Sequence, residues 1–141
     1  MGNQDVIRVG EVQRMTAGTG VVHSEYNPSN TSANHFLQIW LYPDQKDLAP
    51  DYEQKLFGDP PWGDWRKVVS PTGDQGSLRI NQQTSIYDAK VEQGRRLVFK
   101  TSLAKLIGYN SFRENSGFAI LKCGLETVLP SWRKTLIFYL F

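Results

Sequence analysis

The segment from His35 to Tyr42 limits the fold more than any other part of this 141-residue chain. It reads HFLQIWLY, and both of its alternating faces are largely apolar. Side chains on a strand alternate between the two faces of a sheet, so a strand that is apolar on both faces is typical of a sandwich or barrel core. The segment therefore predicts a strand that is buried on two sides.

The rest of the chain follows an antiparallel β pattern, in which short β-prone runs alternate with glycine bends and polar loops. We expect further strands over residues 5–9, 11–15, 76–80, 84–91 and 96–102, and one that carries His23. A connector rich in Asp and Pro follows residue 43, and there we expect at most a turn of helix, near Pro50–Lys55. The pattern predicts an all-β fold.

His23 and Glu25 stand two residues apart in a glycine-led run. On a strand they project the same way, while Ser24 points to the opposite face. An imidazole nitrogen and a carboxylate oxygen are ligands of zinc and of the iron sites that keep positions open for substrate or O₂. The spacing alone leaves two interpretations open, half of a metal site or a polar, partly exposed strand face.

Several motifs in register resemble the pirin family of bicupins. Gly10, Thr16, Gly18, His23 and Asn27 approximate a cupin motif in which glycines and a turn precede His-x-x-x-Asn. The other matches are GEVQRMTAGTG at 10–20, HFLQIWL at 35–41, YEQK at 52–55, VSP at 69–71 and GSLRINQ at 76–82. The resemblance covers roughly residues 1 to 102.

The resemblance implies a site for a divalent metal, with iron expected, that is held by three histidines and one glutamate. It also implies quercetin 2,3-dioxygenase activity, as in some family members, and a flavonol-like small molecule as partner. His23 and Glu25 match the third and fourth ligands, and Glu25 is also the candidate catalytic base. The first two ligands, a His-x-His segment in the family, have no counterpart here. The only other histidine, His35, we interpret as a buried structural residue and not as a ligand.

The resemblance also implies a cupin-like jelly-roll sandwich, as part of a bicupin. We expect the end of the first cupin at 1–43, a connector at 44–75, and the start of a second cupin at 76–141. The tail is atypical, and we hypothesise a reading-frame shift in it. Its last six residues, LIFYLF, are typical of an aggregation-prone edge strand.

Charge and composition exclude several classes of function. The net charge of +2 comes from interspersed charges, so no basic stripe indicates nucleic-acid binding. No apolar run approaches the roughly 20 residues of a membrane helix, and the polar start does not resemble a secretory signal. The single cysteine, Cys123, favours a reducing compartment, and we expect a cytoplasmic location.

These residues and motifs lead to three hypotheses about function. The first is a pirin-type metallo-dioxygenase, impaired in this chain because the His-x-His ligands are absent. The second is a non-enzymatic metal-binding or redox-sensing regulatory protein, and the third is an inactive truncated remnant. Exposed strand edges favour a protein partner or self-association. We interpret Trp40, Trp62 and Trp65 as packing residues in preference to flavonoid-stacking residues.

Overall fold

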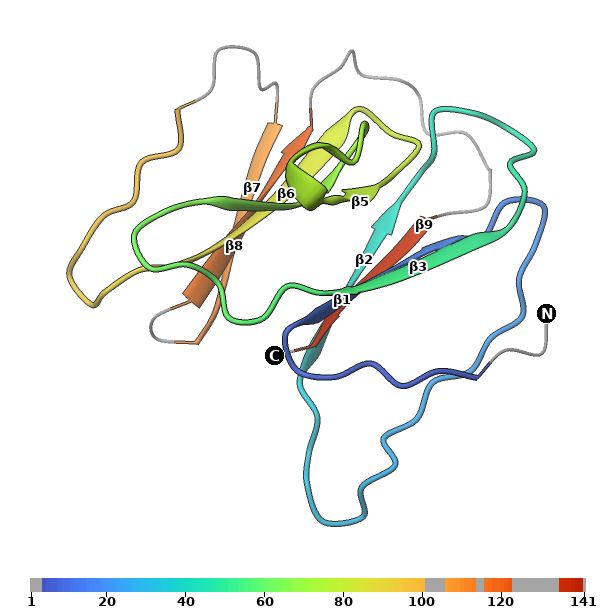
Figure 1. Ribbon diagram of the computed structural model, residues 1–141, viewed down its shortest axis with the longest axis horizontal. Coiled ribbons are helices and arrows are strands. Elements are labelled where there is room, and N and C mark those ends of the chain that lie inside the picture. The colour runs from blue at the N-terminus through green and yellow to red at the C-terminus, as the bar shows by residue number, and fades with distance from the viewer. Residues whose placement is uncertain (1–3, 101–105, 114–115, 123–134, 141) are drawn as a thin grey trace. The chain divides into compact units, whose positions relative to one another are not determined.

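The computed structural model describes residues 4–100, 106–113, 116–122 and 135–140, and these form two β-sheets (Figure 1). One compact unit comprises Met1–Gly58 with Trp132–Phe141, and the other comprises Asp59–Ser131. Helix is limited, in the described ranges, to a single 3-10 turn at Asp74–Gly76. The all-β prediction is therefore confirmed.

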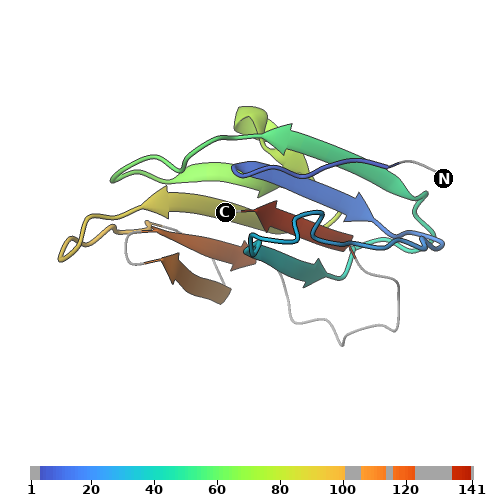
Figure 2. The ribbon, with the colours of Figure 1, turned by 90° about the horizontal axis from the view of Figure 1, so that it is seen from below.

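The first unit holds a four-stranded antiparallel sheet. Its strands are β1 (Glu11–Thr16), β2 (Phe36–Leu41), β3 (Asp51–Leu56) and β9 (Thr135–Leu140). Their order is β2-β9-β1-β3, so β9 lies between β2 and β1, as the red strand in Figure 2 shows. Two strands from the first 41 residues, β1 and β2, are thus joined through β9, which is almost a hundred residues further along the sequence.

The two faces of this sheet differ in burial. On β1, Val12, Arg14 and Thr16 point to one face and are 0%, 5% and 1% exposed. The opposite face, which we call the open face, carries alternate residues of three strands: Glu11, Gln13 and Met15 of β1, Phe36, Gln38 and Trp40 of β2, and Tyr52, Gln54 and Leu56 of β3. Phe36, Trp40, Tyr52 and Leu56 of this face are exposed.

The second unit holds a five-stranded sheet of order β5-β4-β6-β8-β7. Its strands are β4 (Arg66–Ser70), β5 (Leu78–Arg79), β6 (Thr84–Lys90), β7 (Leu106–Arg113) and β8 (Ser116–Lys122), and only the β4–β5 pair is parallel. Among the residues whose burial is described, the buried apolar ones of this unit lie on β4, on β5 and just after it, and on β6. They are Val68, Val69, Leu78, Ile80, Ile86 and Ala89.

Most of the predicted strands are confirmed, and their bounds agree within a few residues. The run at 11–15 is β1, His35–Tyr42 contains β2, 76–80 contains β5, and 84–91 contains β6. No strand forms over residues 5–9, around His23, or over 96–100, while residues 101 and 102 lie outside the described ranges, as does Cys123. The prediction of a helical turn near Pro50–Lys55 is wrong, because residues 51–56 form β3 and pair with all six residues of β1.

Two predictions about burial are also corrected. β2 is not buried on both sides, since Phe36 is 46% and Trp40 is 51% exposed, and the strand stands at the end of the sheet order. The apolar C-terminal strand is not an edge, because β9 pairs with β2 on one side and with β1 on the other. A strand with two neighbours tolerates a continuous apolar sequence, whereas an edge strand does so poorly.

Candidate metal centre

The candidate ligands lie on an irregular segment that leaves β1 through a tight bend. The Gly20 amide donates to the Ala17 carbonyl at 2.8 Å, and the Thr19 amide donates to the Leu48 carbonyl at 3.0 Å. Gly18 has φ +51°, and a Cβ there would lie 2.1 Å from the Leu48 oxygen. Only glycine combines this conformation with so close an approach of backbone, so the bend is specified by sequence.

After the bend, the segment is anchored to the open face of the first sheet. Val21 packs against the buried side chain of Met15, together with Ile7. Beyond Glu25, Asn27 organises the loop that follows. Its amide donates to the Ser32 carbonyl at 2.7 Å, and its side-chain oxygen accepts from the Ser29 amide at 3.0 Å. His23 and Glu25 therefore lie on a short stretch that is held at Val21 on one side and at Asn27 on the other.

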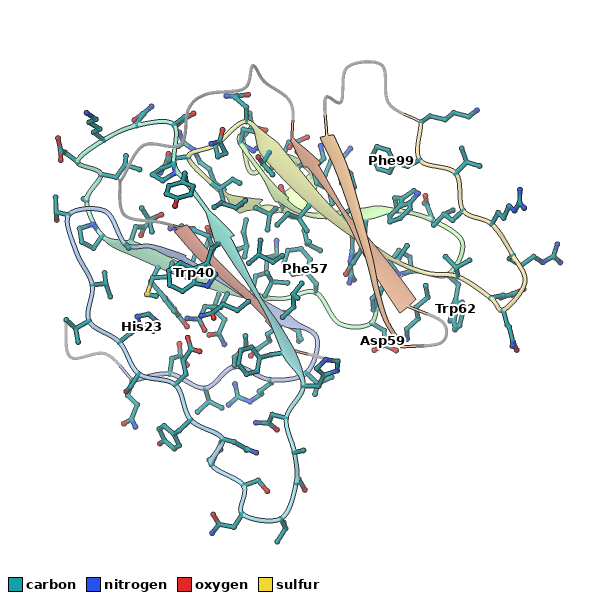
Figure 3. All side chains as sticks on the ribbon, turned by 180° about the vertical axis from the view of Figure 1, so that it is seen from behind. His23, Trp40, Phe57, Asp59, Trp62 and Phe99 are labelled. Atoms are coloured by element: carbon teal, nitrogen blue, oxygen red, sulfur yellow. The ribbon has the colours of Figure 1, made fainter. Side chains whose placement is uncertain are left out.

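The structure brings His23 and Glu25 together, as their spacing predicts. Nε2 of His23 lies 3.5 Å from Oε1 of Glu25, and the two side chains are 34% and 39% exposed. The backbone there is irregular and extended, not a strand, yet it keeps both side chains on one side. Figure 3 labels His23 in this unit.

The electrostatics of the pair depend on the environment of Glu25. Partial burial of this carboxyl group raises its pKa, and the neighbouring His23 opposes that rise. Desolvation disfavours the charged carboxylate, whereas an adjacent positive charge favours it. A bound cation would act on Glu25 in the same direction as a protonated His23.

The separation of the two donor atoms suits a shared metal ion. Ligands at about 2.1 Å from one ion lie about 3.0 Å apart at an octahedral angle and about 3.4 Å apart at a tetrahedral one. The observed 3.5 Å needs only a small adjustment. In the part of the chain that the structure describes, no group of three or more His, Cys, Asp or Glu side chains could hold a metal. The pair therefore fits a metal as two of its ligands.

His35 stands directly before β2 and is exposed, so the expectation that this histidine is buried is wrong. A buried charged side chain of this unit is that of Arg14. Its guanidinium lies 2.7 Å from the carboxylate of Asp51 and 3.2 Å from that of Glu53.

Sequence reasoning missed the polar residues of the open face. Gln54 donates to the Val6 carbonyl at 3.0 Å and to Glu11 at 2.8 Å, and Tyr52 hydrogen-bonds to Gln54. Partial burial and the carboxylate of Asp5 raise the pKa of Tyr52 to about 12. The alternation of Tyr52, Gln54 and Leu56 indicates one face of a strand, but the preceding Pro50 favoured a helix start instead.

Two segments of the chain match known protein families. Residues 1–41 match the family described as Pirin, and residues 67–109 match the family described as Quercetinase C-terminal cupin domain. No solved structure matches the chain. No helix among the described residues is long and apolar enough to span a membrane.

Two curated relatives give the extent of the similarity. The chain is 45% identical over 132 residues to quercetin 2,3-dioxygenase of Escherichia coli strain K12. It is 33% identical over 132 residues to the protein of the same name from Escherichia coli O157:H7. Both alignments cover 94% of the chain, so the similarity continues past residue 102, where the recognisable motifs stop. The chain spans about half of the length of these relatives, 56% in each case.

Proposed function

Because the chain belongs to the pirin family of cupin proteins, we propose that it is part of a metal-dependent dioxygenase that cleaves flavonols oxidatively. In this proposal His23 and Glu25 are two of the metal ligands, and iron is the metal. The observation that carries the proposal is the 3.5 Å separation of Nε2 of His23 and Oε1 of Glu25. The name of the relatives, quercetin 2,3-dioxygenase, supports the substrate class.

In this proposal His23 and Glu25 would hold the metal, and Glu25 would also accept a proton from the substrate. His23 and Glu25 offer one nitrogen and one oxygen donor from the same side of the segment. Glu25 is also the group that would accept the proton of a flavonol hydroxyl, and partial burial, which raises its pKa, favours that role. Iron, when bound, supplies Lewis acidity toward a flavonol oxygen and the redox chemistry with O₂.

We further propose that these 141 residues by themselves bind iron weakly and have little or no activity on flavonols. Two donors do not supply the chelation of three or four preorganised ligands. Both side chains are also more than a third exposed, so water reaches the positions that a shaped cavity would close. The alternative of a non-enzymatic metal-binding protein shares the pair and differs in the absence of turnover.

The test is anaerobic calorimetry of the chain with Fe(II), followed by O₂ consumption with quercetin. His23→Ala and Glu25→Ala should each weaken iron binding by about tenfold or more, which corresponds to about 1.4 kcal/mol. His35→Ala is the matched control, because it removes the other histidine and should leave binding unchanged. Tight binding that survives His23→Ala would refute the assignment of the ligands.

A further inference from the structure

β3 is an edge strand of the first sheet. It stands at one end of the sheet order and, among the described residues, pairs with β1 alone; it is the green strand beside the blue one in Figure 2. Tyr52 and Leu56 of β3 are 39% and 64% exposed. The outer side of an edge strand can accept a further strand, so the residues of this edge indicate which partner it fits.

The direction of the backbone groups of β3 follows from one hydrogen bond. The Phe57 amide donates to the Gly10 carbonyl at 2.9 Å, and these two residues continue the register in which Glu11 is opposite Leu56. Hydrogen-bonded and non-hydrogen-bonded pairs alternate along an antiparallel ladder, so alternate residues of β3 bond toward β1 and the others direct their amides and carbonyls outward. The outward-facing residues are Tyr52, Gln54 and Leu56.

We propose that this edge pairs with the same edge of a second copy of the chain. In the proposed contact two β3 strands run antiparallel about a two-fold axis at Gln54, and the two four-stranded sheets become one continuous sheet. Tyr52 of each copy is then opposite Leu56 of the other on the open face, so the contact partly removes these side chains from water. Two-fold contacts that use one patch twice are the commonest arrangement of identical chains.

The charges of β3 select the position of the axis. Outward-facing backbone groups bond only with each other, so the axis must pass through a residue and not between two residues. With the axis at Gln54, Glu53 of each copy is directly opposite Lys55 of the other. With the axis at Glu53 or at Lys55, two like charges would face each other, and an axis nearer either end of β3 would leave fewer paired residues. Directly opposed residues of opposite charge stabilise a strand pair, whereas like charges destabilise it.

Both charged side chains reach solvent and also have contacts within the chain. The side chain of Glu53 is 45% exposed, and its carboxylate lies 3.2 Å from the guanidinium of Arg14. Lys55 is exposed, and its ammonium lies 5.3 Å from the ring centre of Phe57. In the proposed register Glu53 and Lys55 form non-hydrogen-bonded pairs, in which the side chains of facing residues are closest. Their attraction therefore adds to these contacts and does not require their loss.

The first experiment locates the axis by disulfide cross-linking in a chain that also carries Cys123→Ser. Gln54→Cys should give a linked dimer under mild oxidation, because facing residues have Cα atoms about 5.5 Å apart, which a disulfide spans. Glu53→Cys and Lys55→Cys should give little, because each would lie about 8 Å from its counterpart. Linking at position 53 or 55 that equals linking at position 54, or no linking at any of the three, would overturn the proposal.

The second experiment measures association of the full chain by sedimentation equilibrium, where a dimer has twice the 16.1 kDa mass of the chain. Gln54→Pro removes an amide that faces away from β1, as an edge strand tolerates, and should weaken association about fivefold or more because two bonds at the axis are lost. Gln54→Ala is the matched control, since it loses the same side chain, keeps the amide and should associate as the unchanged chain does. A monomeric unchanged chain, or equal losses in both variants, would contradict the proposal.

A charge reversal tests the same contact without changing the backbone. Lys55→Glu and Glu53→Lys should each weaken association about fourfold or more, because like charges then face each other at two positions. An equal mixture of the two variants should form mixed dimers, since every facing pair again has opposite charges. Native mass spectrometry counts the mixed dimers, and circular dichroism establishes that each variant is folded. A mixture that associates no better than either variant alone would refute the proposed register.

Discussion

Arg66 holds the buried carboxylate of Asp88 in a two-pronged ion pair, with Nε 3.0 Å from Oδ1 and Nη2 2.6 Å from Oδ2. The Asp88 side chain is 4% exposed and the Arg66 side chain is 24% exposed. The pair joins β4 to β6 at the position where Arg66 is opposite Asp88 in the register. It is therefore a fixed polar contact within the second sheet.

Removing one partner of this pair should destabilise the second unit strongly. Arg66→Ala leaves a buried carboxylate without its main counter-charge, and we expect the free energy of unfolding to fall by about 3 kcal/mol. Arg66→Lys should lose less, because the charge remains but the planar fork is gone. Urea unfolding followed by circular dichroism measures both losses.

The double variant Arg66→Met with Asp88→Leu is the informative control. Replacing both charges by apolar groups of similar size leaves no buried charge, so this variant should be more stable than Arg66→Ala. If the double variant proves the less stable of the two, the loss in Arg66→Ala does not come from an uncompensated carboxylate.

The turn around Asp74 should make stability depend on pH in the acid range. Its carboxylate accepts hydrogen bonds from Lys67 at 2.7 Å, Ser70 at 2.8 Å and Thr72 at 2.9 Å. These bonds, that from Lys67 above all, hold the pKa of Asp74 well below its ordinary 3.8. A group whose pKa is depressed on folding stabilises the fold above its ordinary pKa and loses that effect as the pH falls. The urea midpoint should therefore decrease below pH 3.8.

Asp74→Asn should flatten this acid dependence, because the amide does not titrate. Glu92→Gln serves as the comparison, since the Glu92 carboxylate forms an exposed ion pair with Arg95 at 3.7 Å. An Asp74→Asn profile that still follows the unchanged chain below pH 3.8 would assign the dependence to other carboxylates.

The bend at Gly18 should be far less tolerant of a side chain than the turn at Gly94. Both glycines have positive φ, +51° and +76°, which costs an alanine about 1–2 kcal/mol. A Cβ at Gly94 meets nothing within 4 Å, whereas at Gly18 it lies 2.1 Å from the Leu48 oxygen. Thermal unfolding should show a loss beyond about 2 kcal/mol for Gly18→Ala alone. Because the bend places His23, this variant should also weaken iron binding, and Gly94→Ala should not.

The hydroxyl group of Tyr52 should ionise at a higher pH than that of an ordinary tyrosine. Burial and the neighbouring Asp5 raise its pKa to about 12, from an ordinary value of 10.0. A pKa that is raised on folding gives a stabilisation that is complete below pH 10 and is lost as the pH rises toward 12. Asp5→Asn should lower the pKa of Tyr52, as read from tyrosinate absorbance, and Asp44→Asn in an exposed loop should leave it unchanged. A late tyrosinate signal that persists in Tyr52→Phe would assign it to another tyrosine.

Runs of β-prone residues bounded by turn residues were sufficient to predict β1, β2 and β6. The same reasoning failed for β3, where Pro50 followed by a polar sequence resembles a helix start. Pairing of all six residues of β3 with β1 overrides that local preference. The spacing of His23 and Glu25 predicted their proximity, although the strand on which that prediction was based does not form.

Long-range pairing was beyond the reach of sequence periodicity. LIFYLF has no polar alternation, and nothing local indicates that residues 135–140 insert between β2 and β1. The same limit applies to Trp40, whose apolar neighbours Ile39 and Leu41 indicate a core strand. Its exposure follows from the position of β2 in the sheet order, which only the fold reveals.

The place of β9 in the first sheet sets an order of events during synthesis. The second unit is a continuous stretch, residues 59–131, so it can form before residues 135–140 of β9 are made. The first sheet has to wait, because β1 and β2 are joined through β9, which is made long after both of them. The segment with His23 and Glu25 is thus made early and acquires its supporting sheet late. Until then β1 can pair only with β3, and β2 lacks the neighbour that it has in the sheet, so this is the stage at which a chaperone would find most to bind.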